Sequence, residues 1–161
     1  MPDFRTLGSV NLDKLRQKDY HIPCYPQERI TMDCVNCKQP MITAELEHVE
    51  IDFCGTCGGI WLDAGELESL LSDETQARQM LSSLTAAPNC TETARKCPIC
   101  RKKMEKVNVG DVHTMVLLDR CPAHGLWFDH GELARVLENG QVDPDGKVVR
   151  MLKEMFGDMK S

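Results

Sequence analysis

The chain has 161 residues, of which 42% are hydrophobic and only 5% aromatic, and its net charge is −6. So few large apolar side chains predict a small core that needs support from bound metal, and the negative charge argues against strong, sequence-independent binding to a polyanion. We expect no membrane-spanning segment, because no run of about 20 apolar residues is present. The opening residues lack an export signal, which favours a cytoplasmic protein.

Residues 1–30 are interrupted by three prolines and predict an irregular N-terminal arm with no assigned function. His21 and Cys24 in this arm, together with Cys90, resemble parts of a third metal site. Solitary cysteines are more often small buried side chains, so we do not count these residues as ligands.

Residues 31–84 form the first of two related segments. Two Cys-x-x-Cys pairs, Cys34/Cys37 and Cys54/Cys57, flank alternating stretches at 41–47 and 49–53 that predict a β-hairpin. A hairpin brings the distant pairs together, and four cysteines at this spacing predict a tetrahedral zinc site. The nine cysteines in the chain favour this interpretation over a disulfide framework, because nothing indicates export.

The sequence after the second pair changes period. Asp63 and Glu66 predict a capping box, in which the Asp side chain accepts a helical N–H, with a long helix continuing to Leu84. Trp61 is a candidate base-stacking platform, but we favour a core role in which it packs the helix on the hairpin. Glu66 is a candidate general base, but the capping box already explains it.

Residues 85–94 predict a linker, and residues 95–140 repeat the pattern, with strands expected at 104–109 and 112–118. Here the predicted ligands are Cys97, Cys100, Cys121 and His124. The histidine lies three residues before the repeat's tryptophan, whereas Cys57 lies four before Trp61. A longer imidazole compensates for the missing residue; His130 and His113 are the alternative ligands.

The second segment closes as the first does. Trp127 precedes a second capping box, Asp129 and Glu132, and a short helix over 131–138. Four protein ligands per site leave no open position for a catalytic water, so neither capping glutamate is expected to act as a base. Residues 141–161 predict a C-terminal amphipathic helix whose apolar stripe needs a partner, self-association being one solution.

Charge is distributed unevenly between the two segments. Residues 31–71 hold one basic and eight acidic residues, whereas residues 95–140 hold eight basic and six acidic ones. A basic cluster surrounds the first pair of the second repeat: Arg95, Lys96, Arg101, Lys102, Lys103 and Lys106. Any weak nucleic-acid binding is therefore predicted to depend on Arg101, Lys102, Lys103 and Lys106.

The order of these motifs resembles the transcription-factor-IIB-like zinc-ribbon family, in two tandem copies. The likeness rests on Cys-x-x-Cys, a hairpin, Cys-x-x-Cys/His and Gly-x-Trp-Leu/Phe-Asp-x-Gly-Glu-Leu, and covers Cys34 to Leu71 and Cys97 to Leu137. The resemblance implies a zinc-ribbon fold and zinc binding. A link to transcription follows by analogy alone.

Together these patterns predict a small metal-stabilised α+β protein of two tandem zinc ribbons followed by a C-terminal helix. Each ribbon consists of a turn that carries two metal ligands (a knuckle), a β-hairpin, a second knuckle and a helix. We expect two structural zinc ions per chain and ribbons that fold separately. The predicted function is macromolecular binding without enzymatic activity, with a protein partner first and nucleic acid or the transcription machinery as the alternative. A zinc-dependent enzyme is the remaining alternative.

Overall fold

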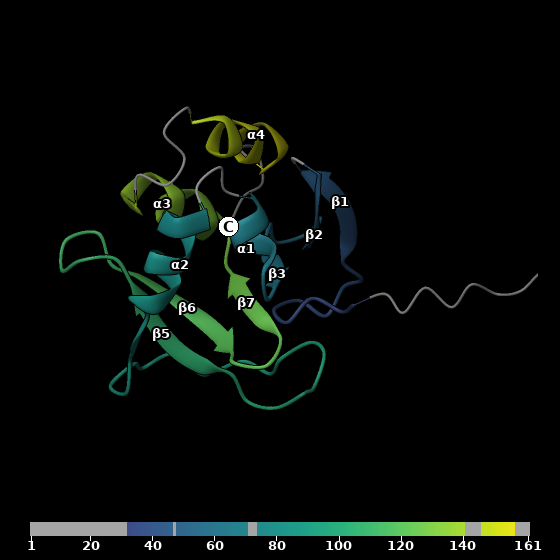
Figure 1. Ribbon diagram of the computed structural model, residues 1–161. Helices are drawn as coiled ribbons and strands as arrows, with labels where there is room; N and C mark the ends of the chain where they lie inside the picture. The colour runs from purple at the N-terminus through teal and green to yellow at the C-terminus, as the bar shows by residue number, and fades with distance from the viewer. Residues whose placement is uncertain (1–31, 47, 71–73, 141–145, 157–161) are drawn as a thin grey trace, which may run out of the picture.

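The computed structural model describes residues 32–46, 48–70, 74–140 and 146–156 (Figure 1). The predicted arm at 1–30, with His21 and Cys24, lies outside these residues, as do both ends of the predicted C-terminal segment.

Each repeat contributes a three-stranded antiparallel unit. In the first repeat, the hairpin strands β1 (Ile42–Leu46) and β2 (Val49–Phe53) are followed by β3 (Ile60–Asp63). The second repeat matches it with β5 (Glu105–Val109), β6 (Val116–Cys121) and β7 (Gly125–Phe128). Both hairpins were predicted from alternation, whereas the third strands were not.

The two repeats share one sheet. The strand order is β1-β2-β3-β7-β6-β5-β4, so β3 and β7 pair at the centre, and Trp61 lies opposite its repeat equivalent Trp127. A strand pair in which equivalent residues face each other places a pseudo-twofold axis between them. The expectation of two separately folding ribbons therefore differs from the structure. The predicted linker also contributes to the sheet, as β4 (Thr85–Ala86), which pairs with β5.

The helices lie on one face of this sheet (Figure 1). The long helix predicted in the first repeat is described as α1 (Glu66–Leu70) and α2 (Glu74–Ser82), and the second repeat has α3 (Glu132–Gly140). The C-terminal helix α4 (Lys147–Phe156) buries most of its predicted apolar stripe against α3 and the first repeat, where Phe156 meets Phe53 edge-on at 5.1 Å. Met155 of the stripe is 38% exposed, and the rest of the stripe is covered within the chain.

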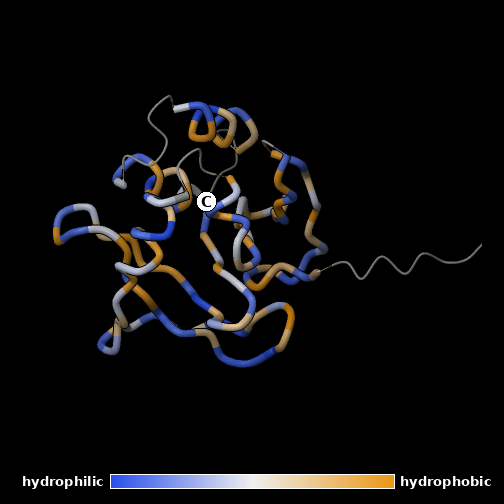
Figure 2. The backbone as a smooth tube through the Cα atoms, in the orientation of Figure 1, coloured by the Kyte–Doolittle hydropathy of each residue, from blue (hydrophilic) through white to orange (hydrophobic). Residues whose placement is uncertain are grey.

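Alternation along the strands creates two apolar clusters, one on each face of the sheet. Ile60 and Leu62 of β3 join the large cluster beneath the helices, whereas Trp61 between them belongs to a cluster that contains cysteines of both repeats. The alternation of apolar and polar residues can be followed along the strands in Figure 2. Both tryptophans are core residues, as predicted, but they pack toward the cysteines rather than between helix and hairpin.

Candidate metal centres

Four cysteines of the first repeat converge on the face of the sheet opposite the helices. Their Sγ atoms all lie within 4.8 Å of one another; Cys34 is 3.6 Å from Cys57, and Cys37 is 3.3 Å from Cys54. Cys34 and Cys54 are buried, whereas Cys37 and Cys57 are half-buried. The hairpin β1–β2 explains this convergence, because it returns the chain beside its first knuckle.

The second cluster has three cysteines and one histidine. Nδ1 of His124 lies 3.3 Å from Sγ of Cys121 and 3.8 Å from Sγ of Cys97, and Cys100 lies 3.8 Å from Cys121. All four ligand atoms lie within 4.8 Å of one another. The structure thus places the eight sequence-predicted residues in two groups of four, and the shortened spacing before Trp127 is accommodated by the histidine.

The two alternative histidines lie elsewhere. His113 occupies the exposed β5–β6 turn, where its backbone N–H donates to Asp111. His130 packs against Gly58 of the first repeat, so closely that a Cβ on Gly58 would lie 2.4 Å from its Nδ1. Cys90 lies outside both clusters, half-buried, with its sulfur accepting the N–H of Glu92 at 3.3 Å.

Both groups fit zinc by separation and by donor type. A tetrahedral zinc ion with Zn–S bonds of about 2.3 Å separates its sulfurs by about 3.8 Å, and the closest pairs in the two clusters lie 3.3–3.8 Å apart. A disulfide requires about 2.05 Å, so these sulfurs are not bonded to one another. Thiolate and imidazole donors are those that structural zinc sites use. The clusters therefore fit two structural zinc ions, one per repeat.

Electrostatics supports the same conclusion. Burial raises the pKa of Cys34, and burial raises that of Cys97 to about 11, so these thiols resist ionisation on their own. Cys54 differs: burial raises its pKa, but the N–H groups of Cys57 and Thr56 outweigh that effect and bring it to about 7. Several sulfurs packed this closely in a partly buried site can all be thiolates only when a cation compensates their charge. A divalent metal ion supplies that positive charge.

The knuckles have matching backbones. In the first, Cys34 N–H donates to the carbonyl of Gln39 at 2.8 Å, and in the second Cys97 N–H donates to that of Lys102 at 2.8 Å. The turn ends with a positive φ in each, 63° at Lys38 and 62° at Arg101. The N–H groups of Asn36 and Cys37 point at the sulfur of Cys34, at 3.3 and 3.4 Å. These donors stabilise an anionic sulfur.

The aspartate of each predicted capping box binds the indole N–H of the preceding tryptophan instead of capping the helix. The indole N–H of Trp61 donates to Asp63 at 2.6 Å, and that of Trp127 donates to Asp129 at 3.0 Å. The reciprocal half of the capping box is present, because Glu66 accepts the N–H of Asp63 at 2.6 Å. Each helix therefore begins at the glutamate, and the aspartate fixes an indole beside the cysteine cluster.

An ion network around the buried Asp119 was missed by sequence reasoning, which assigned its cations to the basic cluster around the first pair of the second repeat. Asp119 is 1% exposed and accepts from Arg95 at 2.7 Å and Lys106 at 3.1 Å. Arg95 also reaches Asp129 at 3.0 Å, and Lys106 reaches Glu92 at 2.8 Å. Spacing carries no signal for this network, because Asp119 is recognisable as a partner only once the hairpin is paired.

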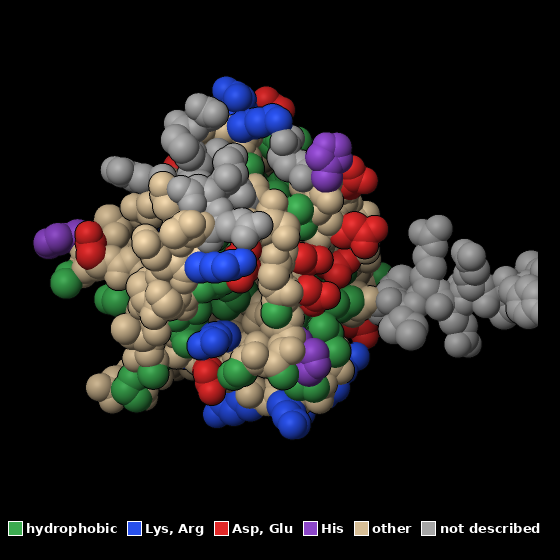
Figure 3. Space-filling model, viewed as in Figure 1, with side chains coloured by type: hydrophobic (Ala, Val, Ile, Leu, Met, Phe, Trp, Pro, Cys, Tyr) green, Lys and Arg blue, Asp and Glu red, His purple; other side chains and the backbone are tan. Residues whose placement is uncertain are grey.

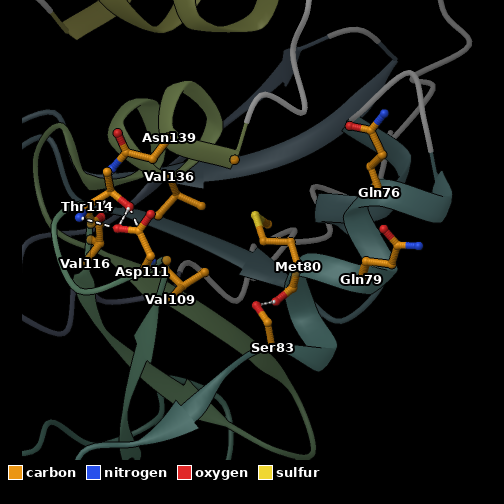
Figure 4. A pocket seen from close by; sticks show the side chains of 12 residues that line it. Gln76, Gln79, Met80, Ser83, Val109, Asp111, Thr114, Val116, Val136 and Asn139 are labelled. Carbon is orange, nitrogen blue, oxygen red and sulfur yellow. Dashed lines mark hydrogen bonds between the residues drawn. The ribbon is translucent and has the colours of Figure 1, made fainter.

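Away from the clusters, a cavity of about 490 Å³ lies between α2, α3 and the β5–β6 hairpin (Figure 4). Met80 and Val136 approach it from opposite walls, and its carboxylate, Asp111, accepts hydrogen bonds from Thr114 and the N–H of His113. Asp111 is thereby tied into the turn as a structural group.

The fold and the two clusters define a zinc-ribbon protein. A family model described as "Transcription factor zinc-finger" matches residues 33–73 and 96–139, which together make up more than half of the chain. The chain belongs to this family, as two copies within one polypeptide. No curated protein and no solved structure matches it significantly. Among the described residues, no helix is long and apolar enough to cross a membrane.

Proposed function

We propose that the protein is a binding module, in which two structural zinc ions hold a shared sheet and the second knuckle presents a basic surface to an acidic protein partner. This surface, the basic knuckle, consists of Lys96, Ile99, Arg101, Lys102 and Lys103.

The observation that carries the proposal is the difference between two knuckles that share one backbone. The matched hydrogen bonds and positive φ values show that zinc geometry requires no particular side chain at these positions. The first knuckle has Asp33, Asn36, Lys38, Gln39 and Pro40 where the second has Lys96, Ile99, Arg101, Lys102 and Lys103. Arg101 thus has a basic counterpart in Lys38, whereas Lys96, Ile99, Lys102 and Lys103 replace residues of another type, and this difference between the knuckles supports a role in binding.

These side chains are available to a partner. All five are exposed, Ile99 to 45%. In the part of the chain that the structure describes, none of the four cations forms an ion pair, in contrast to Arg95 and Lys106. Exposed cations around an apolar side chain offer a partner both an apolar contact and a charged surface, and electrostatic complementarity to an acidic surface guides association.

A protein partner is favoured over nucleic acid by what surrounds the cations. Sequence-tolerant binding of single strands uses exposed aromatic rings, but Trp61 and Trp127 are both 0% exposed. Among the described residues, the exposed large hydrophobic side chains include no aromatic one. The family description is compatible with a partner in the transcription machinery, as an analogy.

The test is capture of partners by the immobilised zinc-loaded chain. The double variant Lys102→Glu/Lys103→Glu is expected to lose them with zinc content unchanged. The matched control Arg135→Glu/Arg150→Glu makes the same charge change at exposed helix positions and is expected to retain them. Equal capture by both variants would show that the basic knuckle is only a solvated surface.

A nuclease arm separates the two partner classes. Protein-mediated capture persists after nuclease treatment, whereas capture through phosphates is lost with the nucleic acid and falls steeply with added salt. Loss of all captured material on nuclease treatment would favour nucleic acid instead.

A further inference from the structure

The pseudo-twofold axis relates each residue of one repeat to an equivalent residue of the other. One pair of equivalent sites differs, because an arginine binds it in the second repeat and none does in the first. Asp52 is paired with Trp61 as Asp119 is paired with Trp127, and each aspartate lies two residues before a cysteine ligand. Asp63 and Asp129 are likewise equivalent, since each accepts the indole N–H of its tryptophan. Each repeat thus carries a pair of aspartates on the cysteine side of the sheet.

In the second repeat a guanidinium bridges this pair. Arg95 donates to Oδ2 of Asp119 at 2.7 Å and to Oδ2 of Asp129 at 3.0 Å. Arginine binds the two carboxylates through two different nitrogens held in one plane, whereas lysine bridges carboxylates through a single nitrogen, as Lys106 does between Asp119 and Glu92.

In the first repeat the bridging arginine is absent. Met32 stands in the position of Arg95, because the N–H of Met41 donates to its carbonyl at 2.8 Å just as Met104 donates to that of Arg95 at 2.8 Å. Thr43 stands in the position of Lys106, and its hydroxyl donates to Oδ1 of Asp52 at 2.6 Å. Among the ion pairs of the described residues, none involves Asp52 or Asp63, in contrast to the two that Arg95 forms with Asp119 and Asp129.

The surroundings of this pair are acidic. Burial raises the pKa of Glu66, and the nearby charges of Asp63, Asp52 and Glu50 raise it further. Asp63 is exposed and Asp52 half-buried, so a ligand can approach from solvent. Figure 3 shows acidic side chains gathered on the side of the molecule where the first repeat lies.

We propose that Asp52 and Asp63 form an arginine-binding site for a basic segment of a separate protein partner, which supplies the guanidinium that Arg95 supplies within the second repeat. The site goes beyond the proposed function: it has the opposite charge to the basic knuckle and lies on the other repeat, so either surface can fail without the other.

The experiment uses the zinc-loaded full chain and N-acetyl-arginine amide as the probe, followed by the two indole N–H signals in ¹H–¹⁵N NMR. Trp61 donates to Asp63 and reports on the proposed site, whereas Trp127 donates to Asp129, already bound by Arg95, and is an internal control. We expect the Trp61 signal to shift with the arginine amide, less with the lysine amide, and not with the neutral isostere citrulline amide. A Trp61 signal that stays still, or responds equally to citrulline, would overturn the proposal.

Two variants test the assignment to these residues. Asp63→Asn keeps an oxygen for the Trp61 indole while removing the charge, and is expected to weaken arginine binding about tenfold. The matched control Glu105→Gln removes one exposed charge from the second repeat and is expected to bind as the unmodified chain does. Unchanged binding by Asp63→Asn would refute the site.

A gain-of-contact variant completes the design. Met32→Arg is expected to place an internal guanidinium between the two aspartates and abolish the Trp61 response, whereas Met32→Gln retains it. A response of Met32→Arg equal to that of the unmodified chain would count against the proposal. A Trp61 shift that grows with protein concentration alone and disappears in Lys102→Glu would show instead that a second copy occupies the site.

Discussion

Gly125→Ala should disrupt the junction between the two repeats. Gly125 has a φ of +151° and begins β7, opposite Asp63. A Cβ on it would lie 2.0 Å from the carbonyl oxygen of Leu62 and 3.0 Å from Cα of Asp63. Real Cβ atoms essentially never approach within 3.0 Å, so β3 and β7 would have to separate by about 1 Å.

The cost of this separation can be worked out from the contacts at the junction. Backbone strain contributes about 1–2 kcal/mol, displacement of packed strands about 1–3 kcal/mol, and loss of the bond from Ala64 N–H to the His124 carbonyl, 2.9 Å long, about 1 kcal/mol. We expect a total of about 3–6 kcal/mol, together with weaker metal binding by the adjacent His124.

The matched control is Gly131→Ala. Gly131 also has a positive φ, +76°, but a Cβ there would meet nothing within 4 Å, so only the strain of about 1–2 kcal/mol applies. Urea unfolding followed by circular dichroism gives both free energies, and a chromophoric chelator reports zinc release. Equal destabilisation by the two variants would refute the close packing of β3 on β7.

Three further predictions concern the metal clusters and the half-buried Glu132. Elemental analysis should find two zinc ions per chain. Cys37→Ser should remove one zinc ion and lower the stability of both repeats, because they share a sheet. A second repeat of unchanged stability would contradict the shared sheet. His124→Ala should lose the second zinc whereas His130→Ala should keep it, and metal counts on the two variants decide between these ligands. Burial raises the pKa of Glu132 to about 7, above the value of about 4.3 in the unfolded chain, so its protonated form stabilises the fold below pH 4 and this stabilisation is lost as the pH rises through 7. Glu132→Gln should therefore gain about 1–2 kcal/mol relative to the unmodified chain across that range, allowing for partial solvent screening, and parallel pH profiles would exclude the effect.

The ligand sets were predictable because the constraint is local. A Cys-x-x-Cys pair fixes two donors on one turn, and the alternation of Val49 to Phe53 predicts the strand that returns the chain to it. These signals span a few residues and need no knowledge of the rest of the fold. The same holds for the two capping boxes. The three-residue spacing correctly predicted that the side chains of Glu66 and Glu132 accept the backbone N–H groups of Asp63 and Asp129.

The third strands were not predictable in the same way. Ile60 to Asp63 is only four residues long and three of them are buried, so it shows no alternation of exposed and buried positions. Its partner, β7, lies more than sixty residues along the chain. Short strands buried on both faces carry little periodic signal. The sequence of either strand alone also does not indicate which distant strand it pairs with. The ion pair of the half-buried Arg95 was missed for a related reason, since its partner Asp119 is 24 residues away on β6.

The pairing of β3 with β7 also explains why two copies belong in one chain. A single ribbon would end at β3 with an open edge, and its Trp61 would lack the opposing Trp127 that completes the buried cluster. An exposed apolar strand edge promotes association with other chains, so the second copy removes an edge while building a shared core.

Equivalent residues on both sides of the pseudo-twofold axis hold the metals and the junction between the repeats. The remaining positions can therefore differ between the repeats without loss of the fold. The two repeats differ at such positions in the sign of their charge, which gives one shared sheet two chemically distinct surfaces.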